Sequence, residues 1–332
     1  MLPIQSSRVL PVYRLFSSPL LLTISLFSSA PARAEVDLLT SIKPLQLIAA
    51  AVQEGVDTPA VLLPAGASAH HYALRPSDVR HVRGADLFYW IGPDMEGFLA
   101  PVLKGRDGPK VVLQSLPGLT LRHFGDSHDE HDHHSESHDG HAEHAGHDEH
   151  AEHDHDHRPG SLDAHLWLLP ANALVIAEQM AGDLAVLDPT NAQRYQANLA
   201  AFKARLDALD QRLQTRLAAV SDKPFFVFHE AYDYFETAYG LEHTGAFSAG
   251  GETQPGARHV AAMRERLQQA GPSCVFYEPP SRPRLADTLS RGLPVKLAEL
   301  DAMGNTIEAD ARGYERLVEG LGTTLAECLE SL

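Results

Sequence analysis

The stretch DPTNAQRYQANLAAFKARLDALDQRLQTRLAAV, residues 188–220, decides the fold of this 332-residue chain. Its apolar side chains recur every three or four residues, at Tyr195, Leu199, Phe202, Leu206, Leu209, Leu213 and Leu217. This spacing predicts one helix of about 30 residues, roughly 45 Å long, with a single apolar stripe. A coiled coil would show the same stripe. Because strand-like runs resume directly after residue 220, we predict a long rigid helix that joins two lobes.

Short apolar runs alternate with helical segments on both sides of this helix. Before it, the strand-like runs are 36–42, 60–63, 86–91 and 111–113, and the prolines near predicted helix starts are Pro44, Pro76 and Pro93. Pro170 opens a further helix, to about Leu187. After residue 220, the strand-like runs are 225–228, 243–247, 274–277 and 294–300, and helices are expected near Ala231, Val260, Arg284 and Tyr314.

This alternation predicts an α/β protein with two βαβ lobes, each containing a mostly parallel sheet. We divide the chain into an N-terminal lobe at 35–169, connecting helices at 170–220 and a C-terminal lobe at 221–332. The cleft between the lobes is the expected ligand site.

Residues 1–34 have the features of a secretory signal peptide. Arg8 and Arg14 precede the apolar run 19–30, and Ala32-Arg33-Ala34 is a small-x-small cleavage signal. A membrane anchor is the alternative, but the run is about a dozen residues and a spanning helix needs about 20. We therefore expect an exported protein without stable membrane insertion.

The cysteine content agrees with export. The chain has two cysteines, Cys274 and Cys328, which in an oxidising compartment predict one disulfide between the last helix and a strand of the second lobe. A thiolate metal site is the alternative. Their spacing is unlike the CxxC pairs of zinc knuckles.

The segment from His123 to His157 is unlike an ordinary folded domain. It holds 13 of the chain's 20 histidines and 12 acidic residues, but no Lys or Arg. We expect it to be disordered without a ligand, because it has too few apolar side chains to offset its ordering entropy. An acidic spacer would not need histidine at every second or third position. We predict a flexible collector of Zn, Ni or Cu, with accessory low-affinity ligands at His128, His131, His133, His134, His138, His141, His144, His147, His150, His153, His155 and His157.

The formal net charge of −17 comes mainly from this segment, which supplies −12. The rest of the chain has no basic cluster. We therefore expect neither nucleic acid nor anionic lipid as a partner.

Metal-ligand side chains recur where the predicted strands end. His70 follows the run VLLPAGASA, His229 directly follows FFVF, and Asp301 directly follows VKLAEL. In open parallel sheets, ligands bind outside the carboxyl ends of the strands. His165 belongs with them, because it lies just beyond the histidine-rich segment and before the helix at Pro170. Three imidazoles and one carboxylate, two groups from each lobe, suit tetrahedral Zn²⁺, whereas Mn²⁺ favours more oxygen ligands.

Two glutamates are expected next to these ligands. Glu230 could orient the free ring nitrogen of His229, and Glu278, in the turn after the run 274–277, is a similar candidate. Surface or packing roles are the expectation for the remaining histidines of the folded lobes, which are His71, His81, His243 and His259.

Seven runs of the chain carry a resemblance to a known family: LLPAGASAHHYALRPSDV, ADLFYWIGPDMEGFL, DAHLWLLP, PFFVFHEAYDYF, TQPGARHV, CVFYEPPSRP and LAELDAMGNTI. They resemble the metal-receptor family of bacterial ABC importers, and its periplasmic zinc-uptake branch most closely. The match covers essentially all of the mature chain, in order. It implies two lobes joined by a rigid helix, Zn²⁺ held between the lobes, and delivery of the metal to a membrane permease with its ATPase.

The resemblance also assigns residues. It carries metal-ligand roles onto His70, His165, His229 and Asp301. Ala69 stands where several zinc receptors have an acidic residue, which favours Asp301 as the fourth ligand. However, residues 300–304 read LDAMG where the family usually reads LDPLG, and losing the proline loosens the turn that would aim Asp301. Water is therefore the alternative fourth ligand.

The sequence predicts a high-affinity zinc receptor, monomeric, located in the periplasm and not an enzyme. A manganese or iron receptor of the same fold is one alternative. A secreted zinc hydrolase would need an open zinc position beside a general base, typically on an HExxH helix, and the chain has no such motif. A zinc-sequestering protein without a transporter is the third alternative.

Overall fold

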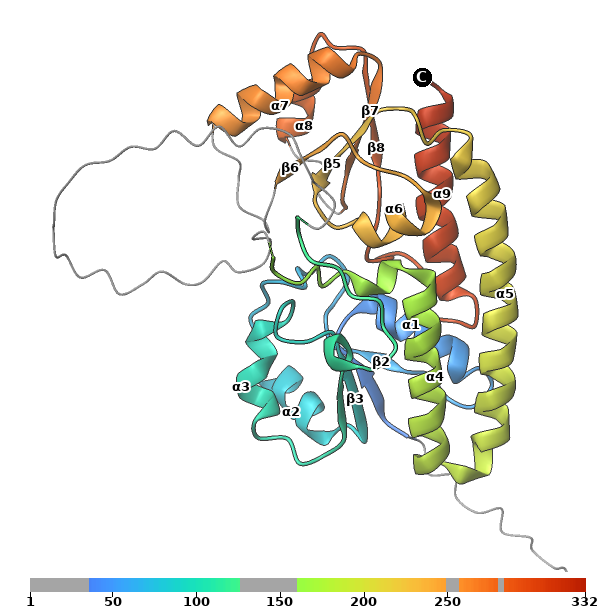
Figure 1. Cartoon of the computed structure of the whole chain (residues 1–332). Helices are drawn as coiled ribbons and strands as arrows, with labels where there is room; N and C mark the ends of the chain where they lie inside the picture. Colours follow the sequence, from blue (N-terminus) through green and yellow to red (C-terminus); the bar gives the residue numbers. More distant parts are fainter. Residues whose placement is uncertain (1–35, 126–159, 249–256, 280–283) are drawn as a thin grey trace, which may run out of the picture. The chain divides into compact units, whose positions relative to one another are not determined.

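The computed structural model describes residues 36–125, 160–248, 257–279 and 284–332, which are coloured in Figure 1. The predicted signal peptide and the twelve accessory histidines at 128–157 lie outside these ranges. Glu35–Leu332 forms one compact unit. Within the described ranges, no helix combines the length and apolar character needed to cross a membrane.

The first half of the chain builds a parallel four-stranded sheet in the order β2-β1-β3-β4. Its strands are β1 (Leu38–Thr40), β2 (Ala60–Val61), β3 (Leu87–Trp90) and β4 (Lys110–Val112), and the helices of this half are α1 (Lys43–Val52), α2 (Pro76–Gly84) and α3 (Ala100–Leu103). Every residue of β1 and β3 is buried, as expected of central parallel strands covered on both faces.

The second half repeats this arrangement with the strand order β6-β5-β7-β8. Its strands are β5 (Phe225–His229), β6 (Gly245–Ser248), β7 (Ser273–Tyr277) and β8 (Val295–Glu299), and its helices are α6 (Asp233–Tyr239), α7 (Ala257–Ala270), α8 (Arg284–Ser290) and α9 (Gly313–Glu330). The two parallel sheets confirm the α/β fold predicted from the sequence.

A 27-residue helix, α5 (Ala192–Ala218), follows α4 (Pro170–Leu187) and contacts helices of both halves (Figure 1). Its neighbours include α1 and α4 from the first half, and α6 and α9 from the second. Six of the seven stripe residues are buried, and Leu199 is partly buried against the core. Because the stripe packs inside its own chain, the coiled-coil alternative is wrong.

One predicted helix start is also wrong. Pro93 lies in a turn, and the helical segment of this region begins only at Gly97, with a 3₁₀ helix (Gly97–Leu99) that runs into α3 at Ala100. The buried carboxylate of Glu96 explains the difference, because its Oε2 accepts hydrogen bonds from the backbone N–H groups of Ile91 and Gly92, at 2.8 and 3.1 Å. The chain folds back at the end of β3 before a helix can form.

The predicted disulfide is present, between Cys274 in β7 and Cys328 in α9. It closes a loop of 54 residues. In the chain-entropy model, a loop of this size stabilises the fold by about 4 kcal/mol.

Several hydrogen bonds join the two halves beside the predicted site, and three of them involve the residues that follow β8 or the segment after His165. Trp167 Nε1 donates to the carbonyl of Ala302 at 3.0 Å, and the Tyr314 hydroxyl donates to the carbonyl of Trp167 at 2.7 Å. The backbone N–H of Gly66 donates to Asn305 Oδ1 at 2.8 Å. The bond between Gly66 and Asn305 holds the loops that follow β2 and β8 near each other, and the other two hold the segment after His165 against the second half.

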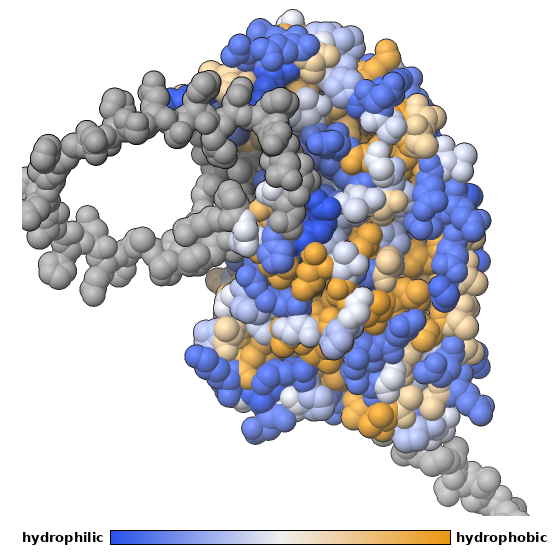
Figure 2. Space-filling model, viewed as in Figure 1, coloured by the Kyte–Doolittle hydropathy of each residue, from blue (hydrophilic) through white to orange (hydrophobic). Residues whose placement is uncertain are grey.

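The visible surface mixes hydrophilic and apolar residues (Figure 2). Among the described residues, the exposed large apolar side chains are Leu121, Val186 and Leu187. Scattered exposed apolar residues are normal on soluble proteins, so they do not define a docking surface.

Candidate metal centre

Three histidines from three separate segments come together at one point. His70 lies in the loop after β2, and His229 is the last residue of β5. His165 directly precedes the short 3₁₀ helix η3 (Leu166–Leu168). One potential ligand atom of each histidine lies within 4.8 Å of the others. The structure therefore brings together the three imidazoles that the sequence selects.

The rings surround a common point and do not stack on one another. Ring centroids are separated by 4.9 Å for His165 and His229, 5.5 Å for His70 and His165, and 5.7 Å for His70 and His229. Nitrogens that share a tetrahedral zinc lie about 3.3 Å apart, given Zn–N bonds of about 2.0–2.1 Å. Small rotations of the rings would bring three nitrogens to this spacing.

A buried carboxylate fixes the orientation of His165. Asp163 Oδ1 lies 2.8 Å from His165 Nδ1 and also accepts the backbone N–H of His165, at 3.0 Å. Asp163 is 1% exposed and His165 is 3% exposed. Because Nδ1 faces the carboxylate, Nε2 is the nitrogen that presents its lone pair to a metal.

A second carboxylate does the same for His229. Glu278, at the end of β7 next to β5, places its two oxygens 3.2 and 3.3 Å from His229 Nδ1. The hydroxyl of Tyr232 lies 3.1 Å from Glu278 Oε1. Carboxylates that hold metal-binding histidines in this way fix the ring and make the opposite nitrogen a stronger donor.

The same carboxylates shift the pKa values of the site. Burial raises the pKa of Asp163 to about 7. Burial alone would lower the pKa of His229, but the charge of Glu278, with smaller contributions from Asp163 and Glu230, raises it above its usual value. Burial would raise the pKa of Glu278, but the charge and hydrogen bond of His229, together with smaller contributions from His165 and Tyr232, outweigh this effect and lower it. The site thus places a carboxylate behind each of two imidazoles, an arrangement that favours a bound cation, either a proton or a metal.

Asp301 is not a member of this histidine group. Its Oδ1 accepts the backbone N–H groups of Met303 and Gly304, at 3.0 and 2.9 Å, and its Oδ2 accepts that of Asn305, at 2.7 Å. The side chain of Asn305 also donates to Asp301 Oδ1. Asp301 therefore builds its own turn, and the same Asn305 accepts the bond from Gly66 in the other half.

Sequence reasoning chose two glutamates near His229 and missed other residues of the site. Glu278 is the residue hydrogen-bonded to His229 Nδ1, while Glu230 acts on the His229 pKa through its charge. Asp163 was missed, although the spacing Asp-x-His in SLDAHLWLLP is a usable signal. Nothing in the sequence pattern singles out Tyr232.

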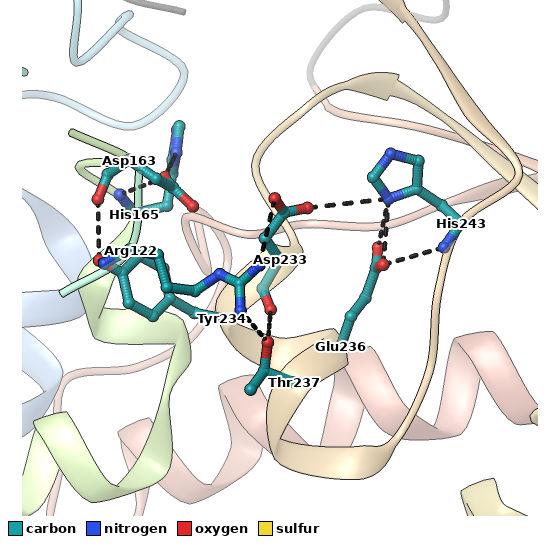
Figure 3. Close-up of polar contacts among 8 residues, drawn as sticks. All are labelled: Arg122, Asp163, His165, Asp233, Tyr234, Glu236, Thr237 and His243. Atoms are coloured by element: carbon teal, nitrogen blue, oxygen red, sulfur yellow. Dashed lines mark hydrogen bonds and ion pairs between the residues drawn. The ribbon is translucent and has the colours of Figure 1, made fainter. Parts of the chain in front are cut away.

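A second group of ligand-type residues lies nearby, formed by Asp233, Glu236 and His243 (Figure 3). His243 Nδ1 lies 2.9 Å from Glu236 Oε1 and 3.8 Å from Asp233 Oδ1. The guanidinium of Arg122 lies 3.9 Å from Asp233 Oδ2. Burial would lower the pKa of His243, but its bond to Glu236 and the nearby acidic charges raise it to about 9.

The second group is thus a buried ion network. At neutral pH two carboxylates face two positive charges, the protonated His243 and Arg122. A metal would have to displace the proton from Nδ1 and sit close to a guanidinium. The structure therefore favours the histidine group as the metal centre.

Comparisons with known proteins identify the family of the chain. A family model described as "Zinc-uptake complex component A periplasmic" matches residues 38–328. The "High-affinity zinc uptake system protein ZnuA" of Yersinia pestis is 38% identical over 299 residues, which cover 90% of this chain and 92% of the relative. The protein of the same name from Haemophilus ducreyi is 40% identical over 298 residues, covering 89% and 94%.

Solved structures show the same fold. A crystal structure of ZnuA superposes with a TM-score of 0.70 at 21% identity, covering 89% of this chain and 99% of that one. A Zn(II)-bound mutant of AdcAII from Streptococcus pneumoniae has a TM-score of 0.69 at 21% identity, covering 89% and 98%. On the family match and the identity to these relatives, the chain belongs to the periplasmic component A family of zinc-uptake complexes.

Proposed function

We propose that this protein captures Zn²⁺ in the periplasm through His70, His165 and His229 and delivers it to the permease of an ABC importer. The observation that carries the proposal is the convergence of three imidazoles, two of them held by buried or half-buried carboxylates. Imidazole is a preferred ligand of Zn²⁺, whereas Mn²⁺ favours oxygen. Family membership supports the transport role, with a permease and an ATPase as partners of a monomeric receptor.

The fourth ligand of the proposed site is an oxygen. Asp301 is one candidate, and it would have to give up bonds to its own turn in order to reach the metal. Water is the other candidate. An Asp301→Ala variant should therefore weaken zinc binding modestly, while a loss as large as that of a histidine variant would identify Asp301 as a direct ligand.

The accessory histidines at 128–157 have a separate proposed role. They are tethered to the chain a few residues from His165, and would raise the zinc concentration beside the site when the metal is scarce. Each such site must order its own backbone before it gains metal bonds. Ordering costs about 1 to 2 kcal/mol of conformational entropy per residue. We therefore expect these sites to be weaker than the three-histidine site.

One titration tests the proposed function. Mature protein, residues 35–332, is titrated with Zn²⁺ and with Mn²⁺ by calorimetry, with competing chelators for the tight event. We expect one tight zinc event, additional weaker zinc equivalents, and weaker manganese binding. Manganese binding tighter than zinc binding would contradict the proposal and support the manganese receptor instead.

A further inference from the structure

Two tyrosines at the start of α6 contact the residues that hold the candidate metal-binding histidines. Tyr232 directly precedes α6 and Tyr234 is its second residue, and the helix itself starts four residues after His229. Tyr232 is 2% exposed and Tyr234 is 0% exposed. Each hydroxyl contacts the residue whose carboxylate holds one of the histidines.

Tyr234 replaces a missing backbone hydrogen bond next to His165. Residues 122–124 and 161–163 pair as a short antiparallel ladder around the bridge between His123 and Leu162. Asp163 N–H donates to the Arg122 carbonyl at 2.9 Å. In a regular ladder, the Arg122 N–H would return a bond to the Asp163 carbonyl.

The hydroxyl of Tyr234 lies in that place. It accepts the Arg122 N–H at 2.9 Å and donates to the Asp163 carbonyl at 3.0 Å (Figure 3). The two backbone groups of Arg122 and Asp163 are bridged by the phenol. The main-chain position of Asp163, and with it the carboxylate that holds His165, therefore depends on a hydroxyl from α6.

The side chain of Arg122 ties the same ladder to α6. Its NH1 donates to Thr237 Oγ1 at 2.6 Å, and its NH2 lies 3.9 Å from Asp233 Oδ2. Asp233 belongs to the ion network with Glu236 and His243. This network thus has a structural use, because it fixes α6 and Arg122 relative to each other.

Tyr232 makes the equivalent link to Glu278, the residue that holds His229. Its hydroxyl lies 3.1 Å from Glu278 Oε1 and 2.7 Å from the carbonyl of Leu300. Glu278 in turn holds Nδ1 of His229. A single segment, residues 232–234, therefore contacts both residues that orient these histidines, Glu278 at its carboxylate and Asp163 at its main-chain carbonyl.

We propose that Tyr232 and Tyr234 are positioning residues for zinc binding, with Tyr234 setting His165 through Asp163 and Tyr232 setting His229 through Glu278. The inference rests on the proposed function, because it takes these histidines as zinc ligands. Loss of partners that orient a metal-binding histidine typically costs about 10- to 100-fold in metal affinity.

The chain supplies a matched control on the same helix. Tyr239 is buried in α6, and its hydroxyl donates to Asp210 in α5 at 2.7 Å. Tyr234→Phe, Tyr232→Phe and Tyr239→Phe each remove one buried hydroxyl. Zn²⁺ affinity is measured by chelator competition, and the absorption bands of bound Co²⁺ report ligand geometry. The tyrosines act one contact further from the histidines than Asp163 and Glu278 do. We therefore expect affinity losses of about 10-fold and altered Co²⁺ spectra for the first two variants, and changes within about threefold for Tyr239→Phe.

A histidine background separates positioning from general destabilisation. In His165→Ala, the affinity measured is that of the weaker zinc binding left to His70 and His229. Tyr234→Phe should cost this residual binding no further affinity, while Tyr232→Phe should keep its full cost. In His229→Ala, Tyr232→Phe should cost no further affinity, while Tyr234→Phe should keep its full cost. The claim therefore stays testable if one tyrosine variant fails to fold. An affinity loss for Tyr234→Phe that equals the Tyr239→Phe control, or that persists unchanged in His165→Ala, would overturn the inference.

The same set of variants separates this inference from the proposed function. If His165→Ala binds zinc as the wild type does, the proposed function fails. If His165→Ala loses tight binding and both tyrosine variants retain it, only the positioning roles fail.

Discussion

Two groups of metal-ligand residue types lie close together in this protein, and they differ in charge balance. In the group of His70, His165 and His229, three imidazoles converge, and carboxylates contact two of them from behind. In the group of Asp233, Glu236 and His243, both carboxylates face the single imidazole, and a guanidinium adds a second positive charge. Short distances between ligand-type side chains are therefore not enough to indicate a metal site.

The two groups differ in the charges and free ring nitrogens that they offer to a cation. The first group has carboxylates behind two of its histidines and imidazole nitrogens that can exchange a proton for a metal. In the second group, the proton on His243 and the guanidinium of Arg122 already neutralise the charge of the two carboxylates. We expect the first group to bind zinc and the second to stabilise the fold, and the predictions below test that division.

The largest expected effect is on zinc affinity. His229→Ala removes one of three imidazoles and should abolish the tight zinc event. His243→Gln removes the imidazole of the other group and should change zinc affinity by no more than about threefold, because it touches none of the ligands. Chelator competition measures both. A tight event that survives in His229→Ala, or is lost in His243→Gln, would reverse the assignment of the two groups.

The second effect is on thermal stability. A ligand that binds only the folded state at a thousandfold excess over Kd stabilises it by about 4 kcal/mol, so zinc should raise the Tm by several degrees. Calorimetric scans of chelator-treated and zinc-saturated protein measure the shift. His243→Gln should keep the shift and His229→Ala should lose most of it. Identical melting curves for wild-type protein with and without zinc would argue against a site formed by folding.

The third effect concerns pH. The folded-state pKa of His243, about 9, lies above the value near 6.5 expected in the unfolded chain. Its contribution to stability, roughly 1 to 3 kcal/mol, is therefore fully present below about pH 6.5 and is lost as pH rises through 9. Urea unfolding of metal-free wild type and His243→Gln across this window measures it, and their difference should shrink as pH rises. A constant difference would show that His243 is not held protonated by Glu236.

The smallest effect on the tight site should come from removing the histidine-rich segment. Deletion of residues 126–157 keeps the ladder of residues 122–124 with 161–163. We expect the tight zinc event to persist with its affinity unchanged, and the weaker equivalents to disappear. In the full-length chain those weaker equivalents should fade as pH falls through about 6, where imidazoles take up protons. Unchanged stoichiometry after the deletion would exclude these histidines as zinc ligands.

Local patterns were enough to predict most of the fold. All eight strands and the long helix follow from periodicity and from runs of apolar residues, because these reflect which face of an element is buried. The error at Pro93 came from a side chain, since Glu96 closes a turn that proline alone does not reveal. His70 and His229 could be chosen because strand ends and the family pattern both select them. His165 could be chosen from the family pattern and from its place before the helix at Pro170.

Residues that act through long-range contacts could not be predicted. Tyr234 contacts Arg122 and Asp163 across separations of 112 and 71 residues, and Tyr232 contacts Glu278 across 46. No local spacing encodes such pairs. Asp301 shows the same limit, because its position after β8 marks it as a ligand candidate while its bonds to residues 303–305 are visible only in the folded turn.

Anomalous scattering at the zinc edge, from crystals of the zinc-loaded mature protein, tests the central claim most directly. We predict that the strongest peak lies about 2.0–2.1 Å from one nitrogen of each of His70, His165 and His229. His243 should show no peak, and its Nδ1 should still face Glu236. A strongest peak between Asp233, Glu236 and His243, or a zinc that contacts fewer than two of the first three histidines, would contradict the account.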